Sequence, residues 1–568
     1  MRQILLVLLS CFFCSSILFG QSFDWSRSFG SSNADYSRAM AVDSKGHVFS
    51  SGSFSGTVDF DPGAGVFNLT AAGISNCYLQ HLDEQGNFVW AIMLESPEII
   101  DLRGIDLDSA GNIYCTGNFK GTVDFDPGSG VFDMSSDTSN YGDCYVLKLN
   151  PAGGFVWAKS YGGIFSDYAA DLVVDNHQNI LVTGYFADSV DFDPGPGVHQ
   201  LYGMSRDIYV LKLDHAGDFV WAIANVEASS NINGDGKGKS IAVDQNDNIY
   251  LAGDVGGEVD FDPGPGQYVL VTNPAVFDGF IQKLDQNGNF QWAKKFSSTF
   301  ACFPHSIVVD QLGAVYTTGI YDGTIDADPS FNNLSFTSTG GWDIFLQKLD
   351  ANGNLEWAHS YGSTSPDYGR GLSMDGNGDI YVAGDFEGSM DFDPGAGIDM
   401  LSNLGRDAFL QKLDGAGNHL WVLQFSSGGT DIGRRVAYTP DGIYMLGNHE
   451  SVIDLDPYAG VSTHVTNGDD DVFVLRLNGL LVASEVGTNN SCLVEVSPNP
   501  SSGAIELRVC EGLSSIPLGV RDAKGSLVMK TVLNEVVTTL DLSRLPSGYY
   551  WLECQLPTGM EMVKVLKF

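Results

Sequence analysis

Residues 409–421, with the sequence FLQKLDGAGNHLW, combine an alternating strand, a tight turn and a tryptophan. Apolar and polar residues alternate from Phe409 to Leu413, as they do in a β-strand that buries one face. The following Asp-Gly-Ala-Gly-Asn is typical of a hairpin turn, in which glycine supplies a left-handed residue. The chain then continues into a second strand, which carries Trp421. The segment therefore predicts a β-hairpin.

Three features of this kind recur seven times along the chain. The aromatic-led strands begin at Tyr78, Tyr145, Tyr209, Phe280, Phe345, Phe409 and Phe473. The tryptophans are Trp25, Trp90, Trp157, Trp221, Trp292, Trp357 and Trp421. The third feature is an Asp-x-Asp-Pro unit, whose carboxylates are Asp59, Asp61, Asp124, Asp126, Asp191, Asp193, Asp260, Asp262, Asp326, Asp328, Asp391, Asp393, Asp454 and Asp456. Three independent markers in seven copies establish an internal repeat.

Most repeats contain a second hairpin, such as Ile105–Asp108, a Gly-Asn turn, and Ile113–Gly117. It ends in a recurring glycine, which we expect to mark close packing where a side chain does not fit. These glycines are Gly52, Gly117, Gly184, Gly253, Gly319, Gly384 and Gly447. Two hairpins give four strands per repeat, and four strands repeated seven times predict an all-β, seven-bladed β-propeller.

The two ends of the repeat array complement one another. The first tryptophan strand, Phe23 to Phe29, has no aromatic-led strand before it, and the last aromatic-led strand, Phe473 to Leu477, has no tryptophan strand after it. If the two pair, one blade is built from both chain ends and the ring closes without open sheet edges. A solenoid of seven repeats is the alternative, and it requires no such complementarity.

The aromatic strand, the Gly-Asn turn, the tryptophan and hairpins of the GNIYVAG type resemble the seven-bladed β-propeller repeats of secreted bacterial proteins (SBBP-type repeats). The likeness covers roughly residues 21–480. It implies the propeller fold and little about activity.

The segments outside the repeats suggest processing and export. Residues 1–20 have one basic residue, an apolar stretch and a small residue at the end, as in a secretory signal peptide. A lipoprotein cleavage before Cys11 is the alternative. After a linker at 481–491, residues 492–568 contain six or seven short strand patterns and predict a small β-sandwich.

This tail contains SPNPSSG at 497–503, DLSRLPSGYYWLE at 541–553 and VKVLKF at 563–568. In that order it resembles the C-terminal sorting domain (type A) of the type IX secretion system of Bacteroidota. The resemblance implies contact with the type IX secretion machinery and export across the outer membrane, followed by removal of the tail or surface attachment. From the residues alone, a carbohydrate-binding module is the alternative.

Charge and cysteine content limit the kinds of partner and site that the chain can have. The 568 residues include 29 Lys+Arg and 70 Asp+Glu, a net charge of −41, which argues against nucleic acid and anionic membranes as partners. Beyond the N-terminal stretch no segment is long and apolar enough for a transmembrane span. No CxxC pair occurs. Cys77 and Cys144, which share a repeat position, are expected to be small core residues.

No catalytic or cofactor motif emerges. The ten histidines form no HExxH motif, and no GxSxG elbow, P-loop or dinucleotide fingerprint occurs in a suitable context. The sequence favours a secreted or cell-surface, non-catalytic binding or scaffold propeller with a glycan or protein ligand. A secreted polysaccharide-degrading hydrolase or lyase, with its site on one propeller face, is the alternative. The recurring tryptophans favour a structural role between blades over sugar stacking.

The Asp-x-Asp-Pro units offer the only candidate metal ligands. Period-two geometry places Asp59 and Asp61 on one face, and Val58 and Phe60 on the other. Two carboxylates this close repel one another unless their negative charge is compensated. Bound calcium, as a cofactor, would provide that compensation. Capping of the local turn by backbone N–H groups is the alternative, and it is favoured.

Overall fold

The computed structural model describes residues 22–478, except 72–75, 97, 137–141, 229–234, 274, 331 and 459, together with strand segments between 495 and 567. The chain divides into two compact units, one ending at Leu481 and the other beginning at Val482. The predicted signal peptide and linker lie outside the described residues. Among the described residues, no helix is long and apolar enough to cross a membrane.

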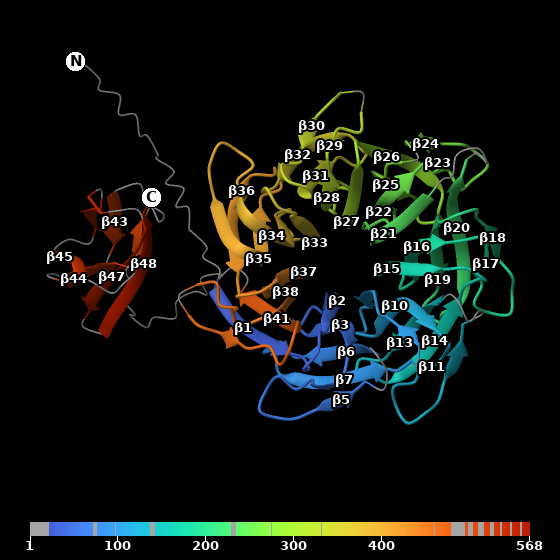
Figure 1. The fold of residues 1–568 in the computed structure, drawn as a ribbon, viewed down its shortest axis with the longest axis horizontal. Helices are drawn as coiled ribbons and strands as arrows, with labels where there is room; N and C mark the ends of the chain where they lie inside the picture. Colours follow the sequence, from blue (N-terminus) through green and yellow to red (C-terminus); the bar gives the residue numbers. More distant parts are fainter. Residues whose placement is uncertain are drawn as a thin grey trace, which may run out of the picture. The chain divides into compact units, whose positions relative to one another are not determined.

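Seven sheets stand around a common centre, as Figure 1 shows. The innermost strands are β2 (Tyr36–Val42), β9 (Gly104–Leu107), β15 (Tyr168–Val174), β21 (Asp235–Val243), β27 (Ala301–Val309), β33 (Tyr368–Met374) and β37 (Asp431–Thr439). The second strands are β3 (Val48–Phe54), β10 (Ile113–Lys120), β16 (Ile180–Phe186), β22 (Ile249–Gly256), β28 (Val315–Asp322), β34 (Ile380–Asp391) and β38 (Gly442–His449). In the second blade β8 (Ile99–Ile100) also pairs with β10.

The third strands are β6 (Asn76–Leu82), β13 (Asp143–Leu149), β19 (Asp207–Leu213), β25 (Asp278–Leu284), β31 (Asp343–Leu349), β35 (Met400–Leu413) and β41 (Asp471–Asn478). The outermost strands are β7 (Phe88–Leu94), β14 (Phe155–Tyr161), β20 (Phe219–Glu227), β26 (Phe290–Ser298), β32 (Leu355–Tyr361), β36 (His419–Phe425) and β1 (Ser22–Phe29). Seven blades of four antiparallel strands confirm the predicted propeller.

The ring closes through the two chain ends. Strand β1 pairs antiparallel with β41, in a register that places Phe23 opposite Leu477 and Phe29 opposite Val472. The seventh blade therefore takes its outermost strand from the N-terminal end of the propeller and its other three from the C-terminal end. The innermost strands of the first and last blades, β2 and β37, also lie against each other. This closure confirms the predicted pairing and excludes the solenoid.

The recurring tryptophans hold neighbouring blades together. The Trp25 indole donates a hydrogen bond to the carbonyl of Glu84 at 3.1 Å, in the hairpin turn of the next blade. In that turn Gly86 leaves room for the ring, since a Cβ there would stand 2.7 Å from Trp25. Further tryptophan–glycine pairs of the same kind are Trp90–Gly153, Trp157–Gly217, Trp221–Gly288, Trp292–Gly353 and Trp357–Gly417. The predicted structural role of the tryptophans is confirmed.

The Asp-x-Asp-Pro segments add small hairpins between the second and third strands. These pairs are β4 (Thr57–Asp59) with β5 (Asn68–Thr70), β11 (Thr122–Asp124) with β12 (Asp133–Ser135), β17 (Ser189–Asp191) with β18 (Gln200–Tyr202), β23 (Glu258–Asp260) with β24 (Val269–Val271), β29 (Thr324–Asp326) with β30 (Ser335–Thr337), and β39 (Ile453–Asp454) with β40 (Thr463–His464). In the sixth blade the long strands β34 and β35 extend into the same pairing.

The second unit contains two sheets. One has the order β42 (Glu495–Ser497), β43 (Ala504–Arg508), β46 (Val537–Asp541), and the other has the order β45 (Leu527–Leu533), β44 (Ile516–Asp522), β47 (Gly548–Leu556), β48 (Gly559–Lys567). Seven described strands in two sheets fit the predicted small β-sandwich.

A buried aspartate begins the third strand in five blades, Asp407 holds the same position within the longer β35 of the sixth, and Asn76 takes its place in the first. Each is at most 4% exposed. Asp343 accepts a hydrogen bond from the Thr339 N–H at 2.9 Å, and Asp471 accepts one from Asn467 at 3.0 Å. Burial raises the pKa of Asp343 to about 6 and that of Asp471 to about 7. Asp343 and Asp471 thus tie the preceding loops to their blades and bind protons at a higher pH than an exposed aspartate does.

We expect the propeller to be more stable near pH 5 than near pH 8. Burial also raises the pKa of Asp207 and Asp367 to about 6, and that of Asp431 to about 7. Between about pH 4 and pH 7 the folded protein binds protons that the unfolded chain has released, so the free energy of unfolding falls as the pH rises. Thermal melting across this range measures the effect. A midpoint that climbs from pH 5 to pH 8 would contradict it.

Candidate functional site

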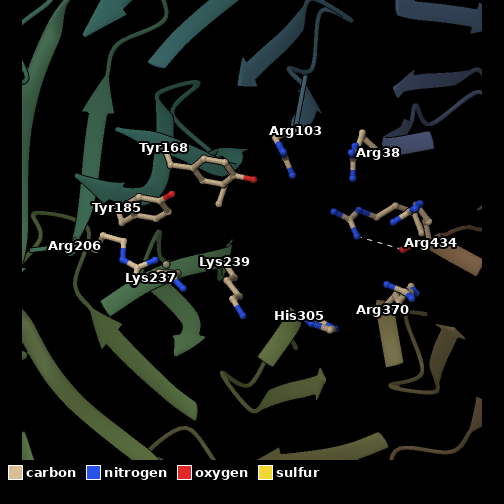
Figure 2. Close-up of a pocket in the computed structure, with 13 residues that line it drawn as sticks. Arg38, Arg103, Tyr168, Tyr185, Arg206, Lys237, Lys239, His305, Arg370 and Arg434 are labelled. Carbon is tan, nitrogen blue, oxygen red and sulfur yellow. Dashed lines mark hydrogen bonds between the residues drawn. The ribbon is translucent and has the colours of Figure 1, made fainter. Parts of the chain in front are cut away.

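A cavity of about 450 Å³ lies among the innermost strands at the centre of the ring (Figure 2). Eight of its lining residues are cationic: Arg38, Arg103, Arg206, Lys237, Lys239, Arg370, Arg434 and Arg435. The other lining residues are Tyr168, Ala170, Tyr185, Gly238 and His305. Of the described residues that line the cavity, none is aspartate or glutamate. In a protein with only 29 Lys+Arg and a net charge of −41, this is a strong local concentration of positive charge.

In six of the seven blades a β-bulge on the innermost strand leaves one residue out of register, and that residue lines the cavity. On β2 the pairing passes from Ser37 to Ala39 and leaves Arg38 out of register. The same shift occurs on β15, β21, β27, β33 and β37, and in the second blade Arg103 takes the corresponding position just before β9. The seven residues at this position, here named the bulge residues, are Arg38, Arg103, Ala170, Lys239, His305, Arg370 and Arg434, and all of them line the cavity. The bulge re-aims the side chain, as bulges beside functional sites commonly do.

The recurring glycine makes this bulge possible. A Cβ on Gly184 would overlap the carbonyl oxygen of Tyr168, which lies two residues before the bulge residue Ala170. The same overlap would occur in the other six blades, between Gly384 and the Tyr368 carbonyl for example. The predicted close packing at these glycines is confirmed, and its reason is the backbone of the bulged strand.

Ion pairs behind the cavity wall fix several of the cations. Arg103 pairs with Asp101 at 2.7 Å, and Arg206 pairs with Asp235. Lys239 and Arg370 pair with buried carboxylates on the second strands of their own blades, Asp254 and Asp385 respectively. Carboxylates thus hold these four side chains in place, and all four residues still line the cavity.

The remaining polar groups of the wall are neutral. Tyr185 stacks on Tyr168 with ring centroids 5.1 Å apart, and the Arg103 guanidinium lies 4.9 Å from the centre of the Tyr168 ring. Burial raises the pKa of Tyr168 to about 12. His305 donates from Nδ1 to the Gly369 carbonyl at 2.9 Å, and burial and Lys239 lower its pKa to about 3. The positive charge of the cavity therefore comes from arginine and lysine.

The structure places the predicted Asp-x-Asp-Pro carboxylates in the outer hairpins, away from this cavity. Asp59 accepts hydrogen bonds from the N–H groups of Asp61 at 3.1 Å and Phe67 at 2.7 Å, and Asp61 accepts one from Gly63 at 2.8 Å. The other six units show the same pattern of hydrogen bonds. Backbone N–H groups thus already compensate part of each carboxylate's charge.

One other acidic group has the geometry of a metal site. Among the described residues, the group of three potential ligands whose atoms lie within 4.8 Å of one another is Asp175, His177 and Asp247. The two carboxylates already have protein partners. Lys212 forms an ion pair with Asp175 at 2.8 Å, and the Asn176 side chain donates a hydrogen bond to Asp247 at 2.7 Å. Calcium binding by the Asp-x-Asp-Pro units stays the untested alternative to turn capping.

Sequence reasoning missed the cavity, although a positional signal exists. In six blades the bulge residue lies 14 positions before the recurring glycine, as Arg38 does before Gly52, and in the seventh blade Arg434 lies 13 before Gly447. Five of the seven positions are Arg or Lys. Counting back from the glycine would have revealed them.

Comparison with known proteins identifies the tail. Residues 495–567 match the family model of the secretion system C-terminal sorting domain. An uncharacterized WD repeat-containing protein of Acanthamoeba polyphaga mimivirus is 22% identical over 501 residues, which cover 74% of this chain and 36% of that protein. The chain thus spans about a third of the length of this curated relative.

The chain also matches solved structures, of which two are given as examples. One is the extracellular domain of a one-component system from B. thetaiotaomicron, with 10% identity, a TM-score of 0.14, and coverage of 96% of this chain and 99% of that chain. The other is PorZ, a surface component of the type-IX secretion system of Porphyromonas gingivalis, with 11% identity, a TM-score of 0.15, and coverage of 96% and 100%. At these TM-scores the superpositions support no inference.

Fold and tail together define a seven-bladed propeller that carries a type IX secretion sorting domain. The protein is therefore exported and is located in the medium or on the outer cell surface.

We expect Gly384→Ala to destabilise the propeller by about 3 kcal/mol, because the new Cβ and the Tyr368 carbonyl cannot occupy the same space. Gly376→Ala is the matched control in the same blade, since nothing lies within 4 Å of a Cβ there. It should change stability by no more than about 0.5 kcal/mol. Denaturant unfolding of both variants measures the difference. Equal effects would show that the glycine does not support the bulge.

We expect calcium to leave the melting temperature unchanged, because backbone N–H groups already bind the Asp-x-Asp-Pro carboxylates. The measurement compares thermal melting in excess EDTA with melting in millimolar calcium chloride. If calcium raised the midpoint by several degrees, these carboxylates would bind the cation in the folded state.

Proposed function

We propose that this exported propeller is a non-catalytic binding protein that holds an anionic ligand in its central cavity. The observation that carries the proposal is the lining of eight arginine and lysine side chains without a described carboxylate. Arginine suits this role, because its planar guanidinium matches carboxylate, sulfate and phosphate groups with two parallel hydrogen bonds.

The size of the cavity restricts the ligand. About 450 Å³ lies within the usual range of small-molecule sites. The propeller as a whole is strongly acidic, so a long polyanion crossing its surface is repelled outside the cavity. A compact acidic molecule, or the charged end of an acidic saccharide, avoids that repulsion. We therefore favour an acidic saccharide terminus as the ligand.

The chemistry of the wall supports binding over hydrolysis. Glycoside hydrolases use a pair of carboxyl groups beside the scissile bond, and the described lining provides none. Tyr168 and His305 are neutral near pH 7, and a pKa of about 3 makes His305 a weak base. If the protein cleaved an acidic polysaccharide as a lyase, that activity would replace the proposed binding function.

The test compares acidic and neutral oligosaccharides of equal length in a calorimetric binding assay. The wild-type protein should bind the acidic saccharide, and Arg370→Gln should weaken binding about tenfold or more by removing one bulge cation. Lys159→Gln, on the outermost strand β14, is the matched control and should bind normally. Equal binding of neutral and acidic saccharides would contradict the proposal. Release of cleaved product would replace binding with catalysis.

A further inference from the structure

Three cavity arginines gather where the ring closes. Arg38 lies on β2 of the first blade, and Arg434 and Arg435 lie on β37 of the last. These two strands pack against each other, although they are almost 400 positions apart in sequence. Figure 2 shows Arg38 and Arg434 on the same side of the cavity. The arginines therefore belong to the seam between the two chain ends.

These arginines differ from the other cavity cations in their partners. Within the described parts of the chain no carboxylate forms an ion pair with any of the three, whereas Arg103, Arg206, Lys239 and Arg370 all have one. Arg434 Nε donates to the Asn448 side-chain oxygen at 3.2 Å, and Arg435 donates to the Arg434 carbonyl at 3.2 Å. Among the described residues, the buried Nε of Arg38 has no hydrogen-bond partner.

Burial and neighbouring arginines lower the pKa values of Arg434 and Arg435. Burial, followed by the charges of Arg370 and Arg38, lowers the pKa of Arg434 to about 9, against the opposing effect of Asp385. Burial also lowers the pKa of Arg435, and Arg370 and Arg38 add to that effect against Asp171. The seam thus contains three neighbouring cations that Asp101, Asp171 and Asp385 offset in part, without forming an ion pair with them among the described residues.

We propose that Arg38, Arg434 and Arg435 form a subsite for one oxyanion group of the ligand, and that its binding fastens the first blade to the last. This subsite rests on the proposed function, because it specifies where the charged group of the anionic ligand sits. A sulfate, phosphate or carboxylate group presents several acceptor oxygens, which match the guanidinium donors. Because the anion bridges two blades of the folded ring, it stabilises the closed propeller by mass action.

The test is thermal melting of the full chain in inorganic phosphate and in sulfate, with sodium chloride at matched ionic strength as the screening control. The wild-type midpoint should rise by several degrees in phosphate or sulfate and less in chloride. Arg38→Gln and Arg434→Gln should melt higher than wild type without phosphate, because repulsion is relieved, and should lose the phosphate-dependent rise.

Lys295→Gln, on the outermost strand β26, is the matched control outside the cavity. It leaves the buried Asp278 without its ion pair, so it should melt lower than wild type without phosphate and should keep the rise. Arg38→Lys retains the charge but not the planar fork, and should keep only part of the rise. If Arg434→Gln does not fold, the size of the phosphate-dependent rise in Arg38→Lys still tests the subsite.

The subsite is overturned if phosphate and sulfate act no more strongly than chloride, or if Arg38→Gln and Arg434→Gln keep the full rise. These results are separable from the proposed function. Saccharide binding without a phosphate effect overturns the subsite alone, and a phosphate effect without saccharide binding overturns the acidic saccharide as ligand.

Discussion

In every blade a backbone carbonyl of the innermost strand occupies the space where the facing residue of the second strand would carry its Cβ. Only glycine fits there, and the chain has glycine at all seven positions, from Gly52 to Gly447. The close approach accommodates a bulge, and the bulge turns one side chain per blade towards the centre of the ring. The basic cavity is a consequence of this repeated steric constraint together with the residue found at each bulge.

The fold also explains how so acidic a protein encloses a basic cavity. The Asp-x-Asp-Pro carboxylates lie in the hairpins outside the blades and accept backbone N–H groups. Other carboxylates stand behind the cavity wall, where Asp254 and Asp385 orient Lys239 and Arg370 without lining the cavity themselves. The position of a side chain in the blade thus decides which charge it carries. These carboxylates lie in the outer hairpins or behind the cavity wall, and the cations line the central cavity. At the seam this compensation is weakest, because no described carboxylate forms an ion pair with Arg38, Arg434 or Arg435.

Much of this architecture could be predicted from the sequence, because its markers are local. The alternation from Phe409 to Leu413, the glycine turn and Trp421 specify a hairpin within thirteen residues, and the unpaired strands at the two ends specify the closure. The cavity could not be predicted in this way. A bulge breaks the period-two pattern at the residue that lines the cavity. The net charge of −41 is a sum over the whole chain, so it does not reveal a local group of cations. The Asp-x-Asp-Pro units attracted attention as metal ligands because their repetition is obvious, whereas the bulge residues vary from Arg38 to Ala170 and His305.

The most direct test of the account is the position of a bound oxyanion. A crystal of the protein soaked in selenate, which resembles sulfate and scatters anomalously, locates the anion without assumption about the natural ligand. We predict that the strongest anomalous peak lies in the central cavity, in contact with Arg38, Arg434 and Arg435. Peaks confined to the outer strands and hairpins, with none among the bulge residues, would contradict the account.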